Sequence, residues 1–319
     1  MKISVIGCGR WGTFIAWYLD RLGHAVTLYG REGSARFQRL AAERKNDYLT
    51  LTESVKLTSS LEEAAMGDTV VVSIGSQQLD ALMKQLAALG VRQKDIVLCM
   101  KGIEVKTGRR LSEIVKDNLD PSNRVAVWIG PGHVQEFTRG IPNCMVIDSE
   151  DASLKEHLAD EFAGDLIRFY YGEDLLGNEI GAAAKNVIGI AAGMLDGHDL
   201  TTLKGALMSR GTREIARLIE AMGGNPLSAY GLCHLGDYEA TVFSPHSQNR
   251  RFGEAFVRGE RYDKLAEGYY TVQALMEFGR QYGVELPICE TVYAILFEGA
   301  EPHASIDALF KRQRKAELR

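Results

Sequence analysis

The chain of 319 residues is long enough for two ordinary domains, and its 45% hydrophobic and 25% charged residues are typical of soluble globular proteins. The formal net charge of −5 argues against a broad nucleic-acid-binding surface, because such surfaces are basic. The five cysteines form no C-x-x-C pair, as in reduced cytoplasmic proteins, and no stretch approaches twenty uninterrupted apolar residues. We therefore expect a cytoplasmic protein with a small-molecule partner, no nucleic acid and no membrane insertion.

A glycine-rich turn follows the first predicted strand. Lys2–Ile6 is short, β-branched and mostly apolar, which is typical of a buried parallel strand. Gly7, Gly9 and Gly12 then form G-x-G-x-x-G, whose glycines allow a tight turn, a close backbone approach to a pyrophosphate and close packing of helix on strand. A second apolar strand at 25–29 completes a β-α-β unit. The pattern predicts a dinucleotide site, and a glycine turn without a ligand is the alternative.

Further strands alternate with helices along the first half of the chain. The sequence predicts strands at 69–74 and 125–129 and another that ends near Lys101. This alternation indicates an α/β fold with a Rossmann-type, parallel, doubly wound sheet. Ligands bind beyond the carboxyl ends of such strands, so we expect one crevice to be lined by residues 73–76, 101–102 and 130–134.

The pattern changes near Leu175, where "LLGNEIGAAAKNVIGIAAGMLDG" is rich in alanine, glycine and isoleucine. Little strand pattern follows, which predicts a mostly α-helical C-terminal domain. We place a dinucleotide-binding Rossmann domain at 1–175 and a helical substrate-binding and catalytic domain at 176–319. The sequence does not separate the exposed apolar faces of the helical domain from its core. It therefore leaves open whether the protein forms a homodimer.

Lys185 lies in the middle of this apolar helix, where a charge is costly unless it has a partner or a task. A nicotinamide enzyme that reduces a ketone needs an acid for the developing alkoxide, and a buried lysine whose pKa is lowered can supply it. Asp237 is the candidate carboxylate beside it, and Lys101 a second cation over substrate or cofactor. The alternatives are that Lys185 reaches solvent, that Asp237 caps a helix N-terminus and that Lys101 is an ordinary loop lysine. No histidine spacing is typical of a metal site, so we expect no metal.

A series of ordered motifs covers nearly the whole chain: "GCGRWGT" at 7–13, "NDYL" at 46–49, "MKGIE" at 100–104, "GP" at 130, "EIGAAAKNVIGIAAG" at 179–193, "SRGTREIARL" at 209–218, "GLCHLGDYEAT" at 231–241, "SQNRRFG" at 247–253, "AEGYYT" at 266–271 and "ELPICETVYAILFEG" at 285–299. With these motifs the chain resembles the NAD(P)-dependent sn-glycerol-3-phosphate dehydrogenases. Members of that family interconvert glycerol 3-phosphate and dihydroxyacetone phosphate.

The resemblance implies roles for individual residues. It makes Lys185 the general acid/base, with Asn186 and Asp237 beside it and Lys101 in contact with both ligands. Cofactor contacts are implied for Gly7, Gly9, Arg10, Trp11, Gly12, Arg31, Lys101, Val134, Gln248 and Glu267. Substrate contacts are implied for Lys101, Gly130, Gly132, Ser247, Gln248 and Asn249.

Three departures from the family pattern fall on the substrate side. Gln248 replaces an arginine expected to anchor the phosphate, and an amide cannot replace a charged, bidentate contact without loss. Gly132, His133 and Val134 stand where Ser-Phe-Ala is usual, which removes a hydroxyl and adds an imidazole. The family's Gly-Asp-Asn after the lysine helix is replaced by the slightly shorter "GHDLTTLKG".

The end of the second predicted strand bears on the choice of cofactor. NAD-preferring turns usually carry an acidic residue there, whereas this chain has Arg31, with Glu32 one residue later. Arg31, with Ser34 and Arg36, suits a 2′-phosphate, so we expect NADP(H) to be preferred. The alternative is that Arg31 stacks on adenine, which leaves NAD(H) acceptable as well.

These observations support three hypotheses of function. The first is a cytoplasmic, NADPH-preferring reductase of dihydroxyacetone phosphate that feeds phospholipid head-group synthesis, with Lys185 as the acid. The second keeps hydride transfer but takes another small hydroxy or keto compound, because Gln248 replaces the arginine. The third is a nucleotide-binding sensor without turnover, against which the intact Lys185, Asp237, Lys101 and Asn186 argue.

Overall fold

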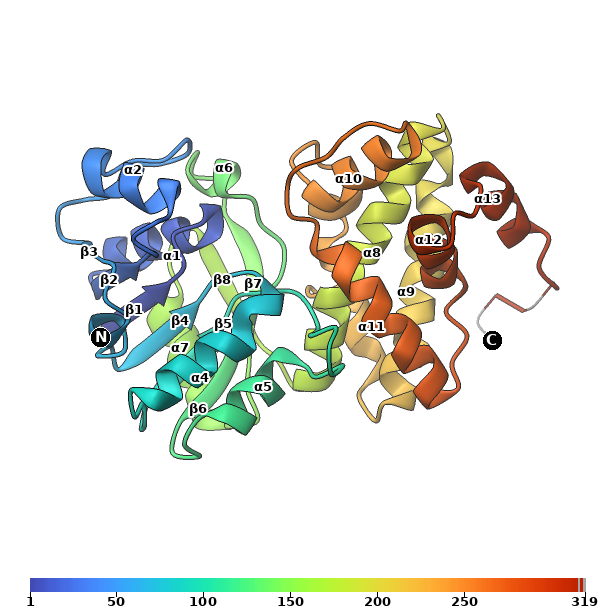
Figure 1. Ribbon diagram of the computed structural model, residues 1–319. Helices are drawn as coiled ribbons and strands as arrows, with labels where there is room; N and C mark the ends of the chain where they lie inside the picture. The colour runs from blue at the N-terminus through green and yellow to red at the C-terminus, as the bar shows by residue number, and fades with distance from the viewer. Residues whose placement is uncertain (315, 318–319) are drawn as a thin grey trace.

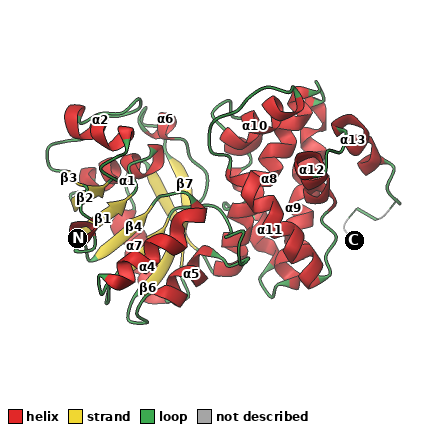
Figure 2. Ribbon diagram, in the orientation of Figure 1, coloured by secondary structure: helices red, strands yellow, loops and turns green. Residues whose placement is uncertain are grey.

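The computed structural model describes residues 1–314 and 316–317. The strands and the helices that cover them form one side of the molecule, and a bundle of helices forms the other (Figure 1). Within the described residues no strand follows Tyr171 (Figure 2). The predicted Rossmann-type sheet followed by a mostly α-helical part is therefore confirmed.

The sheet has eight strands in the order β3-β2-β1-β4-β5-β6-β7-β8. Their bounds are Lys2–Ile6 for β1, Ala25–Tyr29 for β2, Lys56–Thr58 for β3, Thr69–Val72 for β4, Asp95–Leu98 for β5, Arg124–Ile129 for β6, Asn143–Asp148 for β7 and Ile167–Tyr171 for β8. In register, Val5 of β1 pairs with Leu28 of β2 and Val71 of β4. The strand order reverses at β1, and this reversal opens a crevice at the carboxyl ends of β1 and β4.

The sheet departs from the predicted all-parallel arrangement at one strand pair. β7 runs antiparallel to β6, whereas all other neighbouring strands are parallel. The sequence prediction also missed β3, β7 and β8. β3 has only three residues, and β8, at the sheet edge, buries only Ile167 fully, so neither gives the continuous apolar run of a central strand. β4 ends at Val72, two residues before the predicted end.

Side chains of the central strands alternate between two apolar layers. Val5, Val71 and Val97 pack into the layer that includes α1 (Arg10–Arg21), α2 (Ala35–Glu43) and α7 (Ala152–Phe162). Residues one position along the same strands pack on the opposite face, with α3 (Leu61–Ala64), α4 (Leu79–Ala88) and α5 (Leu111–Asn118). A short helix, α6 (Val134–Phe137), follows β6. The sheet is therefore covered on both faces, as a doubly wound fold requires.

The C-terminal part packs around α8 (Leu175–Gly197), which is buried along nearly its whole length. Around it lie α9 (Lys204–Ala221), α10 (Gln248–Val257), α11 (Glu267–Tyr282) and α12 (Pro287–Phe297), and α13 (Pro302–Phe310) packs against α12 (Figure 1). A Cβ on Gly193 would lie 1.8 Å from the carbonyl oxygen of Arg250, and one on Gly253 would lie 2.1 Å from that of Ile190. Gly193 of α8 and Gly253 of α10 therefore allow the two helices to approach at backbone distance.

The first part of α8 also packs against the sheet, because Leu175 and Ala182 belong to the same apolar cluster as α4 and α5. The predicted division at 175 falls at the first residue of α8 and stays a prediction. Among the helices of the described residues, none is both long enough and apolar enough to span a bilayer.

Candidate active site

A cleft of about 850 Å³ lies at the carboxyl ends of the central strands, between the sheet and the helical bundle. It brings together most of the predicted site residues: Gly7, Gly9, Arg10, Trp11, Arg31, Lys101, Gly132, Val134, Lys185, Asn186, Asp237, Ser247, Gln248, Asn249 and Glu267. Gly12 and Gly130 are not part of its lining. The first packs under the glycine turn, and the second offers its carbonyl oxygen to Lys101.

The glycine turn has the geometry of a phosphate cradle. Gly7 has a φ of +117°, and a Cβ there would lie 2.2 Å from the carbonyl oxygen of Ser73. A Cβ on Gly12 would lie 1.9 Å from the carbonyl oxygen of Gly7, whereas a Cβ on Gly9 would meet nothing within 4 Å. α1 begins directly after Gly9 with no side-chain cap and no acidic residue in its first turn. Its first N–H groups are therefore suited to a pyrophosphate.

At the end of β2 the cleft is lined by Arg31, Ser34 and Arg36. Glu32 is not part of the lining, so the position where a ribose-binding carboxylate is usual carries positive charge instead. Ser34 also caps α2, because its hydroxyl accepts a hydrogen bond from the backbone N–H of Phe37. This end of the cleft suits a phosphorylated ribose.

Glu267, the first residue of α11, faces the turn after β4. Its carboxylate accepts hydrogen bonds from the backbone N–H of Ser76 at 3.1 Å and from the Ser76 hydroxyl at 2.5 Å. Burial raises the pKa of this carboxyl above its usual value. Glu267 therefore joins the helical part to the wall of the cleft, in addition to lining it.

The predicted lysines and Asp237 form one cluster, in which Lys185 and Asp237 are buried and Lys101 is half-buried. One carboxylate oxygen of Asp237, Oδ2, lies 2.6 Å from Nζ of Lys185 and 2.6 Å from Nζ of Lys101. Lys185 also donates to the Thr241 hydroxyl at 2.7 Å, and Lys101 donates to the carbonyl oxygen of Gly130 at 2.6 Å. Burial, opposed by Asp237 and reinforced by Lys101, lowers the pKa of Lys185 to about 8. A lysine with this pKa can exchange a proton near neutral pH.

Asn186 joins three segments of this cluster. Its side-chain amide donates to the carbonyl oxygen of Lys101 at 2.8 Å and accepts from the amide of Asn249 at 2.9 Å. Asn249 in turn accepts from the backbone N–H of Gly268 at 2.9 Å. The loop after β5 and helices α8, α10 and α11 are thereby held together at the predicted site.

The sequence analysis missed a second buried network behind the lysines. Nδ1 of His234 donates to the carbonyl oxygen of Gly181 at 2.8 Å, and its Nε2 accepts from the Tyr238 hydroxyl at 2.6 Å. Burial lowers the pKa of His234 to about 4, so the ring is neutral at pH 7. Thr241 was also missed as a partner of Lys185. Its position four residues after Asp237, on the same side of a helical turn, was the available signal.

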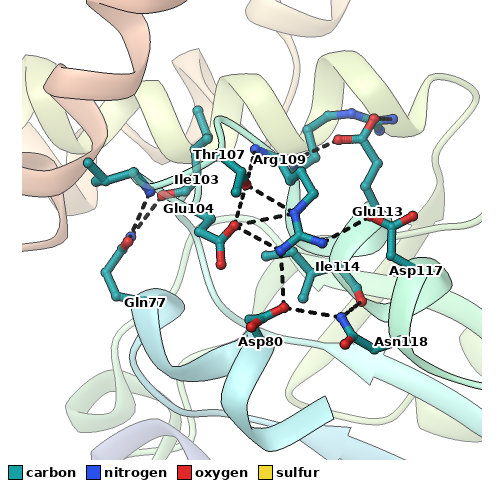
Figure 3. A network of polar contacts seen from close by, with 12 residues as sticks. Gln77, Asp80, Ile103, Glu104, Thr107, Arg109, Glu113, Ile114, Asp117 and Asn118 are labelled. Carbon is teal, nitrogen blue, oxygen red and sulfur yellow. Dashed lines mark hydrogen bonds and ion pairs between the residues drawn. The ribbon is translucent and has the colours of Figure 1, made fainter. Parts of the chain in front are cut away.

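The loop that begins at Lys101 is braced by a cluster around Arg109 (Figure 3). The Arg109 guanidinium lies 3.0 Å from carboxylate oxygens of Glu104, Asp80 and Asp117. The Gln77 side chain donates to the carbonyl oxygen of Ile103 at 2.8 Å. These contacts tie the loop to α4 and α5, so Lys101 projects from a fixed segment.

The far end of the cleft carries two of the three departures from the family pattern, and the third, at 197–205, is not part of its lining. Gly132 has a φ of +156°, and a Cβ there would lie 2.4 Å from the Phe137 ring, which leaves no room for a side chain. His133 and His246 both line the cleft, with ring centroids 5.8 Å apart. Gln248 also lines it, beside Ser247 at the start of α10.

A dinucleotide cradle that opens onto a buried lysine–aspartate cluster defines the class of nicotinamide-dependent dehydrogenases with a Rossmann domain and a helical domain. Residues 2–155 and 174–307 match the family models described as NAD-dependent glycerol-3-phosphate dehydrogenase N-terminus and C-terminus, respectively. The chain belongs to this NAD-dependent glycerol-3-phosphate dehydrogenase family, and the resemblance noted in the sequence is confirmed.

Individual relatives agree along the full length. Proteins named glycerol-3-phosphate dehydrogenase [NAD(P)+] from Exiguobacterium sp. and Thermoanaerobacter sp. are 37% and 36% identical, with 99% and 100% of this chain and 97% and 99% of theirs covered. The crystal structure of glycerol-3-phosphate dehydrogenase from Coxiella burnetii is 28% identical and has a TM-score of 0.90, with 97% of this chain and 98% of that chain covered. A D-mandelate dehydrogenase, 15% identical over 97% of this chain and 100% of that chain with a TM-score of 0.63, shares the fold alone.

Proposed function

We propose that this protein interconverts sn-glycerol 3-phosphate and dihydroxyacetone phosphate by hydride transfer with NAD(P)(H), with Lys185 as the general acid/base. The observation that carries the proposal is the contact of Lys185 and Lys101 with one oxygen of the buried Asp237, in the lining of the glycine-turn cleft. The family and the NAD(P)+ relatives support the same reaction.

The geometry supports a division of tasks between the two parts of the chain. Residues 1–175 would hold the cofactor, whose pyrophosphate fits the open position at Gly9 and the uncapped start of α1. The nicotinamide ring supplies or accepts the hydride when it is bound. Residues 176–319 would supply Lys185, which gives a proton to the carbonyl oxygen in reduction and takes one from the hydroxyl in oxidation.

Lys101 and Asp237 assist this transfer in different ways. Asp237 holds Nζ of Lys185 in place and stabilises its charged form, which burial disfavours. Lys101, fixed by the Gly130 carbonyl oxygen and by Asp237, adds positive charge where the substrate oxygen becomes an alkoxide.

The decisive experiment is oxidation of NADPH and NADH by the purified protein with dihydroxyacetone phosphate, run beside unphosphorylated dihydroxyacetone and a panel of keto acids. We expect turnover of the phosphate ester with a KM in the micromolar to submillimolar range and loss of turnover in Lys185→Ala. NADPH oxidation no faster with dihydroxyacetone phosphate than without it contradicts the proposal.

We infer a preference for NADP(H) over NAD(H) from Arg31, Ser34 and Arg36 at the ribose end of the cleft. Arg31→Ala should raise the KM for NADPH about tenfold or more, the loss of one charge-assisted hydrogen bond, and change the KM for NADH little. Arg39→Ala is the matched control, because Arg39 lies on α2 outside the cleft and pairs with Glu43 and Asp47. Equal losses for both cofactors would instead indicate stacking on adenine.

Gln248 keeps a second candidate open, hydride transfer to a different small hydroxy or keto compound. Turnover of a keto acid in place of dihydroxyacetone phosphate, with a shift toward the phosphate ester in Gln248→Arg, would favour it. Tight NADPH binding without turnover of any ketone would favour the sensor hypothesis. A role in phospholipid head-group synthesis, the cytoplasmic location and the homodimer stay predictions, and light scattering on the purified protein tests the last.

A further inference from the structure

Gln248 does not act as a simple replacement for the family arginine. Its Oε1 accepts a hydrogen bond from the Tyr262 hydroxyl at 2.6 Å, and its Nε2 donates to the backbone carbonyl oxygen of His246 at 3.2 Å. Both polar atoms of the amide are thus engaged with protein groups. The side chain braces the loop that presents His246, so the charge that a substrate phosphate requires must come from other residues.

Two imidazoles occupy the same end of the cleft. His133 comes from the turn between β6 and α6, and His246 from the loop before α10, with their rings 5.8 Å apart at an interplanar angle of 75°. His133 is 9% exposed, and its Nε2 is buried without a hydrogen-bond partner among the described residues. A buried ring nitrogen without a partner is costly, and an acceptor on a bound ligand removes that cost.

The start of α10 adds backbone donors beside the histidines. Ser247 is the N-cap, with its hydroxyl accepting from the backbone N–H of Arg250, and the first turn holds no acidic side chain. The N–H groups of Gln248 and Asn249 have no acceptor within the helix, since they belong to its first turn. Ser247, Gln248 and Asn249 all line the cleft. Together with the helix dipole, these donors favour an anion at this position.

We propose that His133 and His246, together with the first turn of α10, bind the phosphate group of the substrate and take over the role of the arginine that Gln248 replaces. The inference rests on the proposed function, because it concerns the substrate of that reaction. Gln248 then acts as a positioning residue for His246, and His133 and His246 determine specificity for a phosphorylated over an unphosphorylated substrate.

The charge of the surroundings explains why histidine is suitable here. Arg10 of α1 and Lys185 of α8 already place positive charge near His133, with Asp237 as the opposing carboxylate and His246 beside it. Burial, and after it Arg10, lowers the pKa of His133 to about 4, so the ring is neutral at pH 7. A neutral imidazole still donates one N–H to a phosphate oxygen, without the repulsion of a further permanent cation.

The test measures kcat and KM for dihydroxyacetone phosphate and for unphosphorylated dihydroxyacetone in His133→Phe, His246→Gln and the double variant. We expect the KM for the phosphate ester to rise about 10- to 100-fold in each single variant, as for loss of a hydrogen bond to a charged group. The kcat/KM for dihydroxyacetone and the Kd for NADPH should stay within about twofold. His157→Gln on the exposed face of α7 is the matched control.

Gln248→Arg introduced into the double variant gives the complementary measurement. If the histidines bind the phosphate, the new arginine should recover most of the lost KM, and a Tm close to that of the parent excludes a folding defect. An unchanged KM in both single variants, or equal losses with both substrates, overturns the inference and leaves the proposed function intact. Absence of any turnover of dihydroxyacetone phosphate by the unaltered enzyme is the separate result that refutes the proposed function.

Discussion

Asp237→Asn should move the pH dependence of ketone reduction to lower pH. Asp237 contributes the charge that opposes burial at Lys185, where Nζ and Oδ2 lie 2.6 Å apart. With an amide at this position, burial and the neighbouring Lys101 remain, and both lower the pKa of Lys185. The protonated form, which is the acid in reduction, is then lost at a lower pH.

The size of the shift follows from the contact that is removed. A hydrogen bond to a charged group contributes about 1.5–3 kcal/mol, and one pKa unit corresponds to about 1.4 kcal/mol. The pKa of Lys185 should therefore fall by about 1–2 units from its value of about 8. In the parent enzyme kcat for reduction should decline as the pH rises through about 8, and in the variant the same decline should begin about 1–2 units lower.

The assay is the pH profile of kcat and kcat/KM for reduction of dihydroxyacetone phosphate with saturating NADPH. Lys101→Gln is the opposing control, because removal of a cation that lowers the pKa of Lys185 should move the decline to higher pH, whatever its effect on the maximal rate. A decline at the same pH in the parent and both variants would refute Lys185 as the titrating acid, and so would a shift of both variants in the same direction.

Three further substitutions test the glycine turn and the helical core. Gly9→Ala should raise the KM for NADPH without lowering Tm, because a Cβ there meets only open space. Gly12→Ala should lower Tm, because its Cβ would lie 1.9 Å from a backbone oxygen. Equal Tm values for the two variants would contradict this expectation. Burial raises the pKa of Glu214 from 4.5 to about 7, so its proton stabilises the fold below pH 4.5 and this contribution, about 3 kcal/mol, is lost as the pH rises through 7. Glu214→Gln should flatten urea-unfolding free energies between pH 5 and 8, and an unchanged slope would exclude Glu214 as the cause.

The parts of the site that the sequence predicted are those with a local signal. The glycine turn follows a strand and precedes a helix in one short segment, and Lys185 is a charge within an apolar helix. The contacts of His234 with Gly181 and of His246 with His133 join segments far apart in the chain. The hydrophobic periodicity of the sequence does not predict such contacts. The antiparallel direction of β7 could not be predicted either, since strand direction depends on how the chain returns to the sheet and not on side-chain pattern.

The positions of Lys101, Lys185 and Asp237 do not depend on their charges alone. Gly181, one helical turn before Lys185, is bonded to His234, which lies three residues before Asp237, and Asn186 is bonded to the carbonyl oxygen of Lys101. Each charged residue therefore lies within one helical turn of a neutral hydrogen bond to a partner segment, and this bond is buried at Gly181 and half-buried at Lys101. Neither bond involves the Asp237 carboxylate, so we expect Asp237→Asn to change the electrostatics at Lys185 and to keep the backbone geometry. A shifted pH profile in that variant can then be attributed to the pKa of Lys185 and not to a displaced helix.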